Sequence, residues 1–475
     1  MEPRTLESIA AIMGGALSGA GEQIPSGCSI DSRTLQPGEL FFAIVGPHHD
    51  GHRFAQAAVA AGACGLVVSN MDSRPDAAGA ARRAGIPLIT VSDTLRGLQD
   101  LAAHIRRAHP VKVIGITGSA GKTTTKEMTR HVLEGAFRVH ASRGNLNNLY
   151  GCPLSLTELT AQHQACVLEL GMSTHGELTR LAEIADPDIG ILTNVSGAHL
   201  ANFTSLSDYA DAKAELFAGM RDNTTGIFNN DDDQCRRILS GYRGYAVTCG
   251  MDRPSDLTAS DYRLDGLEGS TFEVRHARNG SSRRVQVRMR FAGRHHVYNA
   301  LMAIAAAYML GMDLEAAAAR LADLSPLGMR GRVLKLKGGL RVLDDSYNSN
   351  PGAMRFALQL LREAGQTGGR RVLVFGDMLE LGSAGMEAHR ELGEAIAAAG
   401  VDLAVGVGKL AGVALGALEQ APHGGAARHH FESSQEAAEW MAGAARPGDL
   451  ILVKGSRGIA LEKVVAELHR RFGEE

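Results

Sequence analysis

The sequence is poor in aromatic residues and cysteine, and it carries almost no net charge. Only 5% of its 475 residues are aromatic and its formal net charge is −3, so nothing indicates a nucleic-acid or membrane surface. The six cysteines form no C-x-x-C pair, which favours reduced thiols over a zinc site or a disulfide framework. No apolar run approaches the roughly 18 residues of a membrane span, and the acidic N-terminal residues are unlike a signal peptide. We expect a cytoplasmic protein without membrane insertion or a nucleic-acid partner.

Glycine, by contrast, is abundant, with 57 residues. Strand-like and helix-like segments alternate between glycine-containing turns, which is typical of α/β architecture. The length fits about three domains. We predict a small N-terminal α/β domain over residues 1–109, a central P-loop-type domain with a mostly parallel sheet over 110–325, and a C-terminal Rossmann-like α/β domain over 326–475. The breaks fall at His109-Pro110 and at Pro326.

Four helices and one hairpin are predicted in the central block. The alternating segments around Asn279-Gly280 indicate a β-hairpin, because that dipeptide favours a tight turn between two strands. The predicted helices are 122–133, 176–185, 207–218 and 297–310.

Residues 111–125, VKVIGITGSAGKTTT, are the most informative stretch. An apolar strand-like run ends in a glycine turn, and a helical pattern follows directly. Backbone N–H groups of such a loop, together with the positive end of the helix dipole, bind phosphate oxygens. The predicted nucleotide-binding residues here are Thr117, Gly118, Ser119, Ala120, Gly121, Lys122, Thr123 and Thr124.

The loop is a shortened form of the P-loop. Ile116 stands where the full pattern has its first glycine, which leaves G-x-x-G-K-T. Lys122 is expected to reach the terminal phosphates, and the Thr123 hydroxyl to bind Mg²⁺. A plain glycine turn is the alternative, but the strand and helix on either side favour nucleotide binding.

Polar residues also follow other predicted strands, where ligands of parallel sheets bind. Glu169 ends one strand and can share Mg²⁺ with Thr123, or it can pair with a helix. Asn194 ends another strand, and His199 lies in the loop after it; a lone histidine is usually a satisfied polar residue. Taken alone, Lys213 on a predicted helix is expected to be a solvated surface lysine.

Two segments of the C-terminal block have similar polar ends. Asp344 and Asp345 follow a strand, so they suit a ribose or ammonium contact or a helix N-cap. Residues 454–458, KGSRG, also follow an apolar strand, and their cations beside glycines make a carboxylate or phosphate site.

These pieces together resemble the ATP-dependent Mur ligases of peptidoglycan synthesis, over essentially the whole chain. The shared pieces occur in that family's order: GxxGKT, LELGM, NVSGAHL, DYADAKAELF, GRHHVYNALMAIAAA, DDSYNSNP and KGSR. Three further stretches resemble the branch that adds D-alanyl-D-alanine: CSIDSRTLQPGELFFAIVGPHHDGHRF, GNLNNLYGCPLSL and VFGDMLELG. The third-domain signature of the diaminopimelate- or lysine-adding branch is absent.

The resemblance implies a reaction, cofactors and partners. ATP phosphorylates the free carboxylate of UDP-N-acetylmuramoyl-tripeptide, and the amine of D-alanyl-D-alanine attacks the acyl phosphate. UDP-N-acetylmuramoyl-pentapeptide, ADP and phosphate result. ATP and Mg²⁺ are the implied cofactors, and the chain is expected to be a monomer.

The resemblance also implies residue roles. Lys122, Lys213 and His199 are implied as catalytic residues, and Thr123, Glu169, His199 and a carbamate on Lys213 as Mg²⁺ ligands. Asn299 matches the adenine contact, Asp345 the ribose contact, and Arg330 the phosphate contact, with Arg332 as a rival because MRGR allows two alignments. The implied contacts of the UDP-linked substrate and the dipeptide are Ser32, Arg33, Asn147, Asn148, Lys454, Ser456 and Arg457. One departure is His295-His296, where the family often has His-Asn.

Three other functions remain open on the sequence. A sister ligase of the Mur or folylpolyglutamate type would keep the same core site but use a different amine. A non-catalytic nucleotide-binding protein is disfavoured by the intact Lys122, Glu169, His199 and Lys213. A P-loop kinase or GTPase switch would need a base-reading or nucleophile-positioning motif, and none is found.

Overall fold

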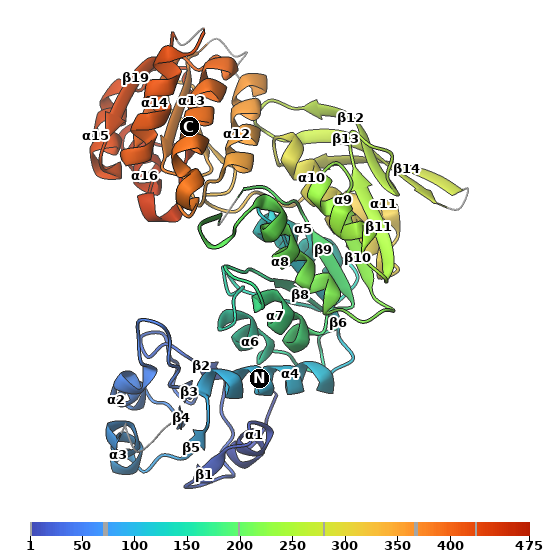
Figure 1. Cartoon of the computed structure of the whole chain (residues 1–475), viewed down its shortest axis with the longest axis vertical. Coiled ribbons are helices and arrows are strands. Elements are labelled where there is room, and N and C mark those ends of the chain that lie inside the picture. Colours follow the sequence, from blue (N-terminus) through green and yellow to red (C-terminus); the bar gives the residue numbers. More distant parts are fainter. Residues whose placement is uncertain (1, 70–74, 198–199, 279–280, 365–368, 423–424) are drawn as a thin grey trace. The chain divides into compact units, whose positions relative to one another are not determined.

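The computed structural model describes residues 2–69, 75–197, 200–278, 281–364, 369–422 and 425–475. Its contacts divide the chain into two compact units (Figure 1). Unit 1 comprises Met1–Thr117, Ala136–Gly190 and Glu215–Thr224. Unit 2 comprises Gly118–Gly135, Ile191–Ala214 and Thr225–Glu475.

The N-terminal part of unit 1 is built on a five-stranded sheet in the order β1-β5-β4-β3-β2. Strand β1 runs antiparallel to β5, and the other neighbours are parallel. The strands are β1 (Ala16–Ser18), β2 (Cys28–Ser29), β3 (Leu40–Phe42), β4 (Gly65–Ser69) and β5 (Leu88–Val91). The helices are α1 (Leu6–Ile12), η1 (Gly51–Phe54), α2 (Ala55–Ala60), α3 (Pro75–Ala84) and α4 (Thr94–Ala108). This arrangement confirms the small α/β fold predicted for the N-terminus.

The remainder of unit 1 is a parallel sheet segment in which β8 lies between β6 and β7. These strands are β6 (Lys112–Thr117), β7 (Val139–Ala141) and β8 (Ala165–Glu169), and the helices are α6 (Gly151–Leu156) and α7 (Glu177–Ala185). Strand β9 (Ile189–Leu192) begins in unit 1 and ends in unit 2. The register pairs Ile116 with Glu169, so Glu169 stands at the carboxyl end of the sheet, as the sequence predicts.

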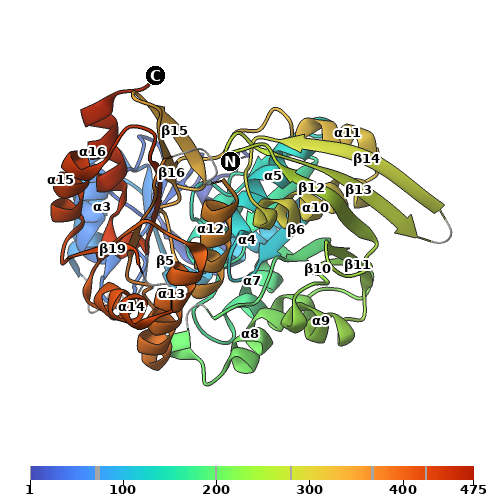
Figure 2. The same ribbon diagram turned by 90° about the horizontal axis from the view of Figure 1, so that it is seen from above.

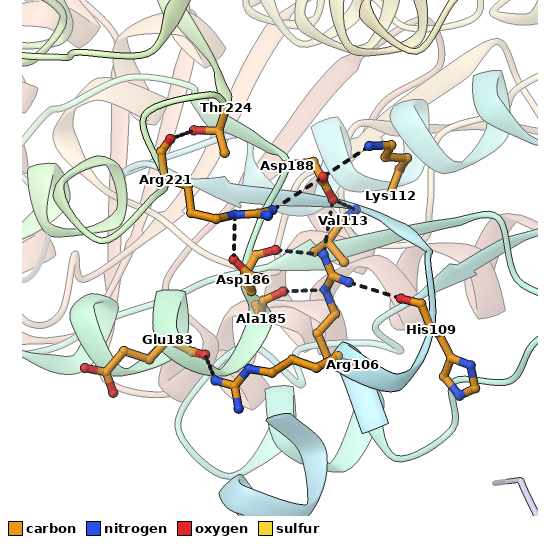
Figure 3. A network of polar contacts seen from close by, with 11 residues as sticks. Arg106, His109, Lys112, Val113, Glu183, Ala185, Asp186, Asp188, Arg221 and Thr224 are labelled. Carbon is orange, nitrogen blue, oxygen red and sulfur yellow. Dashed lines mark hydrogen bonds and ion pairs between the residues drawn. The ribbon is translucent and has the colours of Figure 1, made fainter. Parts of the chain in front are cut away.

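A polar network binds the end of α4 to this second sheet (Figure 3). Arg106 is 6% exposed, and its guanidinium donates to the carbonyl oxygens of Ala185 and Asp186, each at 2.9 Å. The same group lies 3.2 Å from Asp188 Oδ2, which also accepts the N–H of Val113 at 2.9 Å. Because α4 also contacts β3 and β4, it joins both sheets of unit 1.

The central part of unit 2 holds five strands in the order β14-β13-β12-β11-β10. Strands β10, β11 and β12 are parallel, whereas β12, β13 and β14 form an antiparallel meander. They are β10 (Thr225–Asn229), β11 (Tyr245–Gly250), β12 (Leu257–Leu264), β13 (Ser270–Arg278) and β14 (Ser281–Met289). The predicted hairpin is confirmed by the β13–β14 pairing, although its turn, Asn279-Gly280, lies outside the described residues.

Helices surround this part of unit 2. They are α5 (Lys122–Leu133), η3 (Leu200–Asn202), α8 (Leu206–Ala218), α9 (Asp233–Ser240), α10 (Arg294–Met309) and α11 (Leu314–Arg320). Helix α8 begins in unit 2 and ends in unit 1. The predicted start of α10 at Val297 is wrong: Gly293, with φ +106°, precedes a helix that begins at Arg294, so His295 and His296 lie in its first turn.

The C-terminal part of unit 2 is a six-stranded sheet in the order β15-β16-β20-β17-β18-β19. Only β15 is antiparallel to its neighbour. The strands are β15 (Arg332–Leu336), β16 (Leu340–Asp344), β17 (Arg371–Gly376), β18 (Leu403–Val407), β19 (Ala427–Phe431) and β20 (Leu450–Lys454). The helices are α12 (Pro351–Ala364), η4 (Gly382–Ala384), α13 (Gly385–Ala399), α14 (Lys409–Gln420), α15 (Ser434–Ala444), η5 (Arg457–Ile459) and α16 (Glu462–Phe472).

Two apolar cores cover the faces of this sheet. One contains Leu358 of α12, Ile396 of α13 and Leu418 of α14. The other contains Met441 of α15 and Leu468 of α16. Figure 2 shows α15 and α16 on one side of the strands and α12 and α13 on the other, which is the doubly wound arrangement predicted for the C-terminus. Within the described residues, no helix has the length and hydropathy needed to cross a membrane.

Candidate active site

The predicted glycine loop joins the end of β6 to the start of α5, and both of its glycines are sterically required. Gly118 has φ +143° and Gly121 has φ +83°, values that residues with a Cβ rarely adopt. A Cβ on Gly118 would lie 2.0 Å from Thr193 Oγ1, and one on Gly121 would lie 2.6 Å from Asn299 Oδ1. The loop is therefore folded tightly against the residues that face it.

Residues after β9 form a polar frame for the loop. Asn194 holds Ala120 twice: its Oδ1 accepts the Ala120 N–H at 3.0 Å, and its Nδ2 donates to the Ala120 carbonyl at 3.0 Å. Thr193 Oγ1 donates to the same carbonyl at 2.7 Å. The Ser119 N–H donates to the Asn194 carbonyl at 2.9 Å, and Ser119 Oγ bonds with the backbone of Ser196. This frame fixes the shape of the loop.

Lys122 and Thr123 open α5. Lys122 Nζ donates to the Gly118 carbonyl at 2.7 Å, so the side chain folds back along the loop. Thr123 is 6% exposed. The first N–H groups of a helix have no acceptor within the helix, and the dipole makes this end positive. The geometry is that of a phosphate cradle.

Asn299 of α10 lies against the same loop. It is 4% exposed, and its Oδ1 accepts the Thr125 hydroxyl at 3.2 Å. The structure therefore brings this predicted nucleotide contact next to Gly121, although 178 positions separate the two in the sequence.

Lys213 is buried, so the prediction of a solvated surface lysine is wrong. It lies on α8, is 1% exposed, and its Nζ is 4.8 Å from the centroid of the Tyr209 ring. The Tyr209 hydroxyl is 3.3 Å from Ser119 Oγ, and burial raises the pKa of Tyr209 to about 12. Tyr209, which sequence reasoning missed, thus links Lys213 to the glycine loop. Its spacing of four residues from Lys213 was the available signal.

Glu169 and Asn147 meet within unit 1. Glu169 is 3% exposed, and its Oε1 accepts the Asn147 amide at 2.8 Å. Asn148 has a structural partner: its Oδ1 accepts the N–H groups of Tyr150 and Gly151 at the start of α6, at 3.1 and 2.9 Å. Of the two asparagines, Asn147 is the one joined to a candidate metal ligand.

The two adjacent aspartates at the end of β16 have different partners. Asp344 accepts the Ser346 hydroxyl at 2.6 Å, and burial raises the pKa of its carboxyl. Asp345 lies 2.6 Å from Lys454 Nζ, which also donates to the Asn348 carbonyl at 3.0 Å. Asp345 and Lys454 are thus brought together from β16 and β20.

The rival arginines point to different neighbours. Arg330 stacks on Tyr347, with its Cζ 3.8 Å from the ring centroid, and Arg457 lies 5.9 Å from the same centroid. Arg332 instead lies 3.7 Å from Glu474, near the end of the chain. Arg330 is therefore the one that shares a neighbourhood with predicted site residues. Tyr347 was not singled out from the sequence, although it stands two residues after Asp345.

The remaining predicted residues of the C-terminal part and of α10 are largely buried. Ser456 accepts the Leu379 N–H at 2.9 Å, which ties it to the VFGDMLELG segment. Burial lowers the pKa of His295 to about 4, and Lys454 lowers it further against the opposing effect of Asp345. Burial also lowers the pKa of His296, and the rings of the two histidines are 3.9 Å apart. Both imidazoles are therefore neutral at pH 7.

In the N-terminal part, Asp31 organises the segment that contains Ser32 and Arg33. Asp31 Oδ1 accepts the Arg33 N–H at 3.0 Å, and its Oδ2 lies 2.6 Å from Arg33 Nη2. The Arg33 guanidinium lowers the pKa of Asp31. The Arg33 side chain is 86% exposed, so it is accessible to a ligand.

The predicted metal ligands are only partly described by the structure. His199 lies outside the described residues. Among the residues that are described, no group of three or more His, Cys, Asp and Glu side chains forms a metal cluster. Thr123 and Lys213 lie in unit 2 and Glu169 in unit 1. The residues present are oxygen donors and a lysine, which suits a hard cation better than a soft one.

Three domain families match the chain in succession. Residues 25–106 match "Mur ligase family, catalytic domain", residues 116–307 match "Mur ligase middle domain", and residues 329–457 match "Mur ligase, glutamate ligase domain".

Curated relatives span the full length. The UDP-N-acetylmuramoyl-tripeptide–D-alanyl-D-alanine ligase of Bacillus subtilis is 33% identical, with 98% of this chain and 99% of the relative covered. The protein of the same name from Escherichia coli is 36% identical, with 98% of each chain covered.

Solved structures agree with these relatives. The crystal structure of MurF from Acinetobacter baumannii has a TM-score of 0.86 at 30% identity and covers 99% of both chains. That of MurF ligase from Thermotoga maritima in complex with ADP has a TM-score of 0.78 at 25% identity and covers 94% of this chain and 97% of its own. With both sequence and fold matched from end to end, the chain belongs to the Mur ligase family.

Proposed function

We propose that the chain is an ATP-dependent ligase that joins D-alanyl-D-alanine to UDP-N-acetylmuramoyl-tripeptide. The observation that carries the proposal is the framed glycine loop, with Asn299 and the Tyr209–Lys213 pair against it, in a chain whose full-length relatives carry that ligase name. A sister ligase with a different amine is less favoured, because the names of both relatives include D-alanyl-D-alanine as the amine substrate.

The proposed reaction has two chemical steps. A carboxylate oxygen of the tripeptide attacks the γ-phosphorus of ATP, the bond to the β-phosphate oxygen breaks, and ADP leaves. The amine of D-alanyl-D-alanine then attacks the acyl carbon of the acyl phosphate. The tetrahedral adduct collapses, phosphate leaves with the bonding electrons, and the amine proton is released. The protein has to bring anions together and hold them in line.

The glycine loop supplies the first part of that task. Lys122 and the N-terminal N–H groups of α5 offset the charge of the triphosphate, with Thr117, Ser119, Ala120 and Thr124 completing the loop. Asn299 is proposed to contact the adenine, Asp345 the ribose and Arg330 a phosphate. The contacts of Asn194 to Ala120 support the proposal, because they hold the loop at the N-terminal end of α5, where phosphate binds.

Mg²⁺ is the proposed cofactor, held by Thr123, Glu169, His199 and a carbamate on Lys213. Bound there, the ion would offset phosphate charge as a Lewis acid. The place of Glu169 at the carboxyl end of the parallel β6–β8 pair supports this ligand set, because ligands of parallel sheets bind at that end. The carbamate forms when the neutral amine attacks carbon dioxide and loses a proton, which turns the amine into an anionic oxygen ligand.

Substrate contacts are assigned by position. Ser32 and Arg33 are proposed to hold the uridine diphosphate, and Asn147 and Asn148 the muramoyl-peptide. Lys454, Ser456 and Arg457 are proposed to hold the dipeptide. The structural bonds of Asn148 and Ser456 favour a supporting role for these two. Arg33 is paired with Asp31, but its side chain is exposed and so accessible to an anion.

Each of the three domains is proposed to bind one substrate. Residues 1–109 bind the UDP-sugar, 110–325 bind ATP and 326–475 bind the amine. We further propose a monomer acting in the cytoplasm, where ATP and nucleotide-linked precursors are found together.

The test is ADP formation by the purified chain with Mg²⁺, from which the tripeptide substrate and D-alanyl-D-alanine are omitted in turn. We expect sustained ADP release only when both are present. Equal release with L-alanine or D-glutamate in place of the dipeptide would favour the sister-ligase alternative, and no Mg²⁺-dependent release at all would overturn the proposal.

A further inference from the structure

Tyr347 lies between two cations of the candidate site. Its ring is stacked by the Arg330 guanidinium at 3.8 Å, and Arg457 approaches the same centroid at 5.9 Å. A guanidinium over an aromatic face is attracted by the ring quadrupole, and the contact also fixes the orientation of the planar group. One side chain therefore stands beside two arginines that come from different segments of the chain.

The backbone around Tyr347 supports the same arrangement. The Tyr347 N–H donates to the Met329 carbonyl at 3.1 Å, and the Gly331 N–H donates to the Asp344 carbonyl at 2.8 Å. Met329 has φ +60°, a left-handed conformation that is disfavoured for residues with a Cβ and is kept only where the surroundings impose it. The turn that carries Arg330 is thus held in an unfavourable shape by the segment that carries Tyr347.

The cations of this part of the site differ in whether they are paired with a carboxylate. Lys454 is paired with Asp345 at 2.6 Å, and Arg457 with Glu462 at 3.0 Å. Arg330 forms no ion pair with any residue that the structure describes. Its guanidinium instead packs on the aromatic ring of Tyr347. A guanidinium that is oriented but not neutralised is suited to a phosphate or carboxylate of a ligand.

We propose that Tyr347 is a positioning residue for both anionic substrates, because its ring orients Arg330 for a phosphate of the nucleotide and Arg457 for the carboxylate of the dipeptide. The inference rests on the proposed function. It adds that one aromatic side chain couples the nucleotide and amine ends of the site, so that loss of the ring weakens binding at both ends.

Two variants of Tyr347 separate the ring from the hydroxyl. Tyr347→Leu removes the aromatic face at similar bulk, and we expect it to raise the KM for ATP and the KM for D-alanyl-D-alanine, each about five- to tenfold. Tyr347→Phe keeps the face and is expected to restore both KM values to within about twofold. Tyr245→Leu, at a 46% exposed tyrosine, is the matched control. If Tyr347→Leu unfolds at the assay temperature, Tyr347→Met takes its place.

A double-mutant cycle shows whether the ring acts through Arg330. In an Arg330→Gln background, Tyr347→Leu is expected to cause no further rise in the KM for ATP, because the two side chains form one unit. Additive losses would overturn the proposal, and so would equal impairment of the Phe and Leu variants. A rise in only one of the two KM values would disprove the shared role. Equilibrium binding of ADP to the same variants keeps the test valid if the wild-type chain fails the ligation assay.

Discussion

At the scale of single residues, the sequence identifies the groups that make the glycine loop but not the contacts that frame it. Gly118, Gly121 and Lys122 carry a local pattern, because a strand, a glycine turn and a helix start follow one another directly. The sequence marks Asn194 only as a polar residue at a strand end and Tyr209 only by its spacing from Lys213, because their contacts with the loop act across the fold. The burial of Lys213 belongs to the same class: a single lysine on a helix looks solvated until its neighbours are known.

Gly121→Ala tests how closely the glycine loop is packed. The added Cβ meets Asn299 Oδ1 at 2.6 Å, whereas Gly176, with nearly the same φ of +82°, has nothing within 4 Å of its Cβ position. Both alanine variants carry the backbone strain, of the order of 1 kcal/mol. We expect only Gly121→Ala to lose ADP binding, measured by calorimetry. Loss in both variants would mean that strain, not the contact with Asn299, is responsible.

Lys213→Ala tests the carbamate. We expect ligation to fall by at least about a hundredfold, while ADP binding stays within a few-fold, since the lysine is proposed to act on the metal and not on the nucleotide. A short carboxylate such as acetate should restore part of the activity. The matched control is Lys463→Ala, at an exposed position of α16. Undiminished ligation by the unrescued Lys213 variant would remove this residue from the mechanism.

At the scale of elements, apolar strands and the helix that follows the glycine turn are predictable, whereas polar elements are not. The predicted apolar run before the glycine turn is strand β6, in which five of the six residues are buried, and α5 matches its predicted bounds. Strand β19, ARHHF, was missed because it lies at the edge of its sheet and none of its residues is fully buried. The start of α10 was misplaced because His295 and His296 give no apolar signal, although they belong to the helix.

Arg106→Leu tests the network that joins α4 to β6 (Figure 3). It would remove a buried cation from the carbonyl oxygens of Ala185 and Asp186 and from Asp188, so we expect a loss of about 2–4 kcal/mol in the free energy of unfolding. Arg96→Leu breaks a pair whose arginine side chain is 57% exposed, and it should change stability by less than about 0.5 kcal/mol. Denaturant unfolding compares the two. A similar small effect in both would show that the network adds little.

At the scale of the whole molecule, the doubly wound C-terminal sheet, the glycine-loop sheet and the N-terminal α/β layer could all be anticipated. The alternation of strands with helices indicates the class, and the order of motifs along the chain indicates the family. Contacts between distant segments could not be anticipated, because the stacking of Arg330 on Tyr347 or the pairing of Asp345 with Lys454 depends on which strands become neighbours.

The molecule as a whole is expected to lose stability in mild acid. Burial lowers the pKa of His140 to about 4, as it does for His295. Unfolded histidines bind protons near pH 6.5, so between pH 6.5 and about 4 the unfolded state binds more protons and stability falls as the pH falls. Between pH 7 and pH 5, the free energy of unfolding should fall in both proteins. We expect the fall to be about 2 kcal/mol smaller for His140→Gln than for the wild type. Urea unfolding at both pH values measures this, with His48→Gln, at an exposed position, as control. Equal losses in the wild type and His140→Gln would refute the assignment.

The burial of the cysteine thiols has a consequence for chemical labelling. Five of the six cysteines are buried, and none of the six forms a disulfide bond. Burial raises the pKa of the sixth, Cys28, to about 12, so at neutral pH the native chain holds scarcely any thiolate. Mild alkylation should therefore spare the native protein, and one cysteine introduced at an exposed position would take a fluorophore selectively. The native cysteines therefore need not be replaced before a labelling cysteine is introduced.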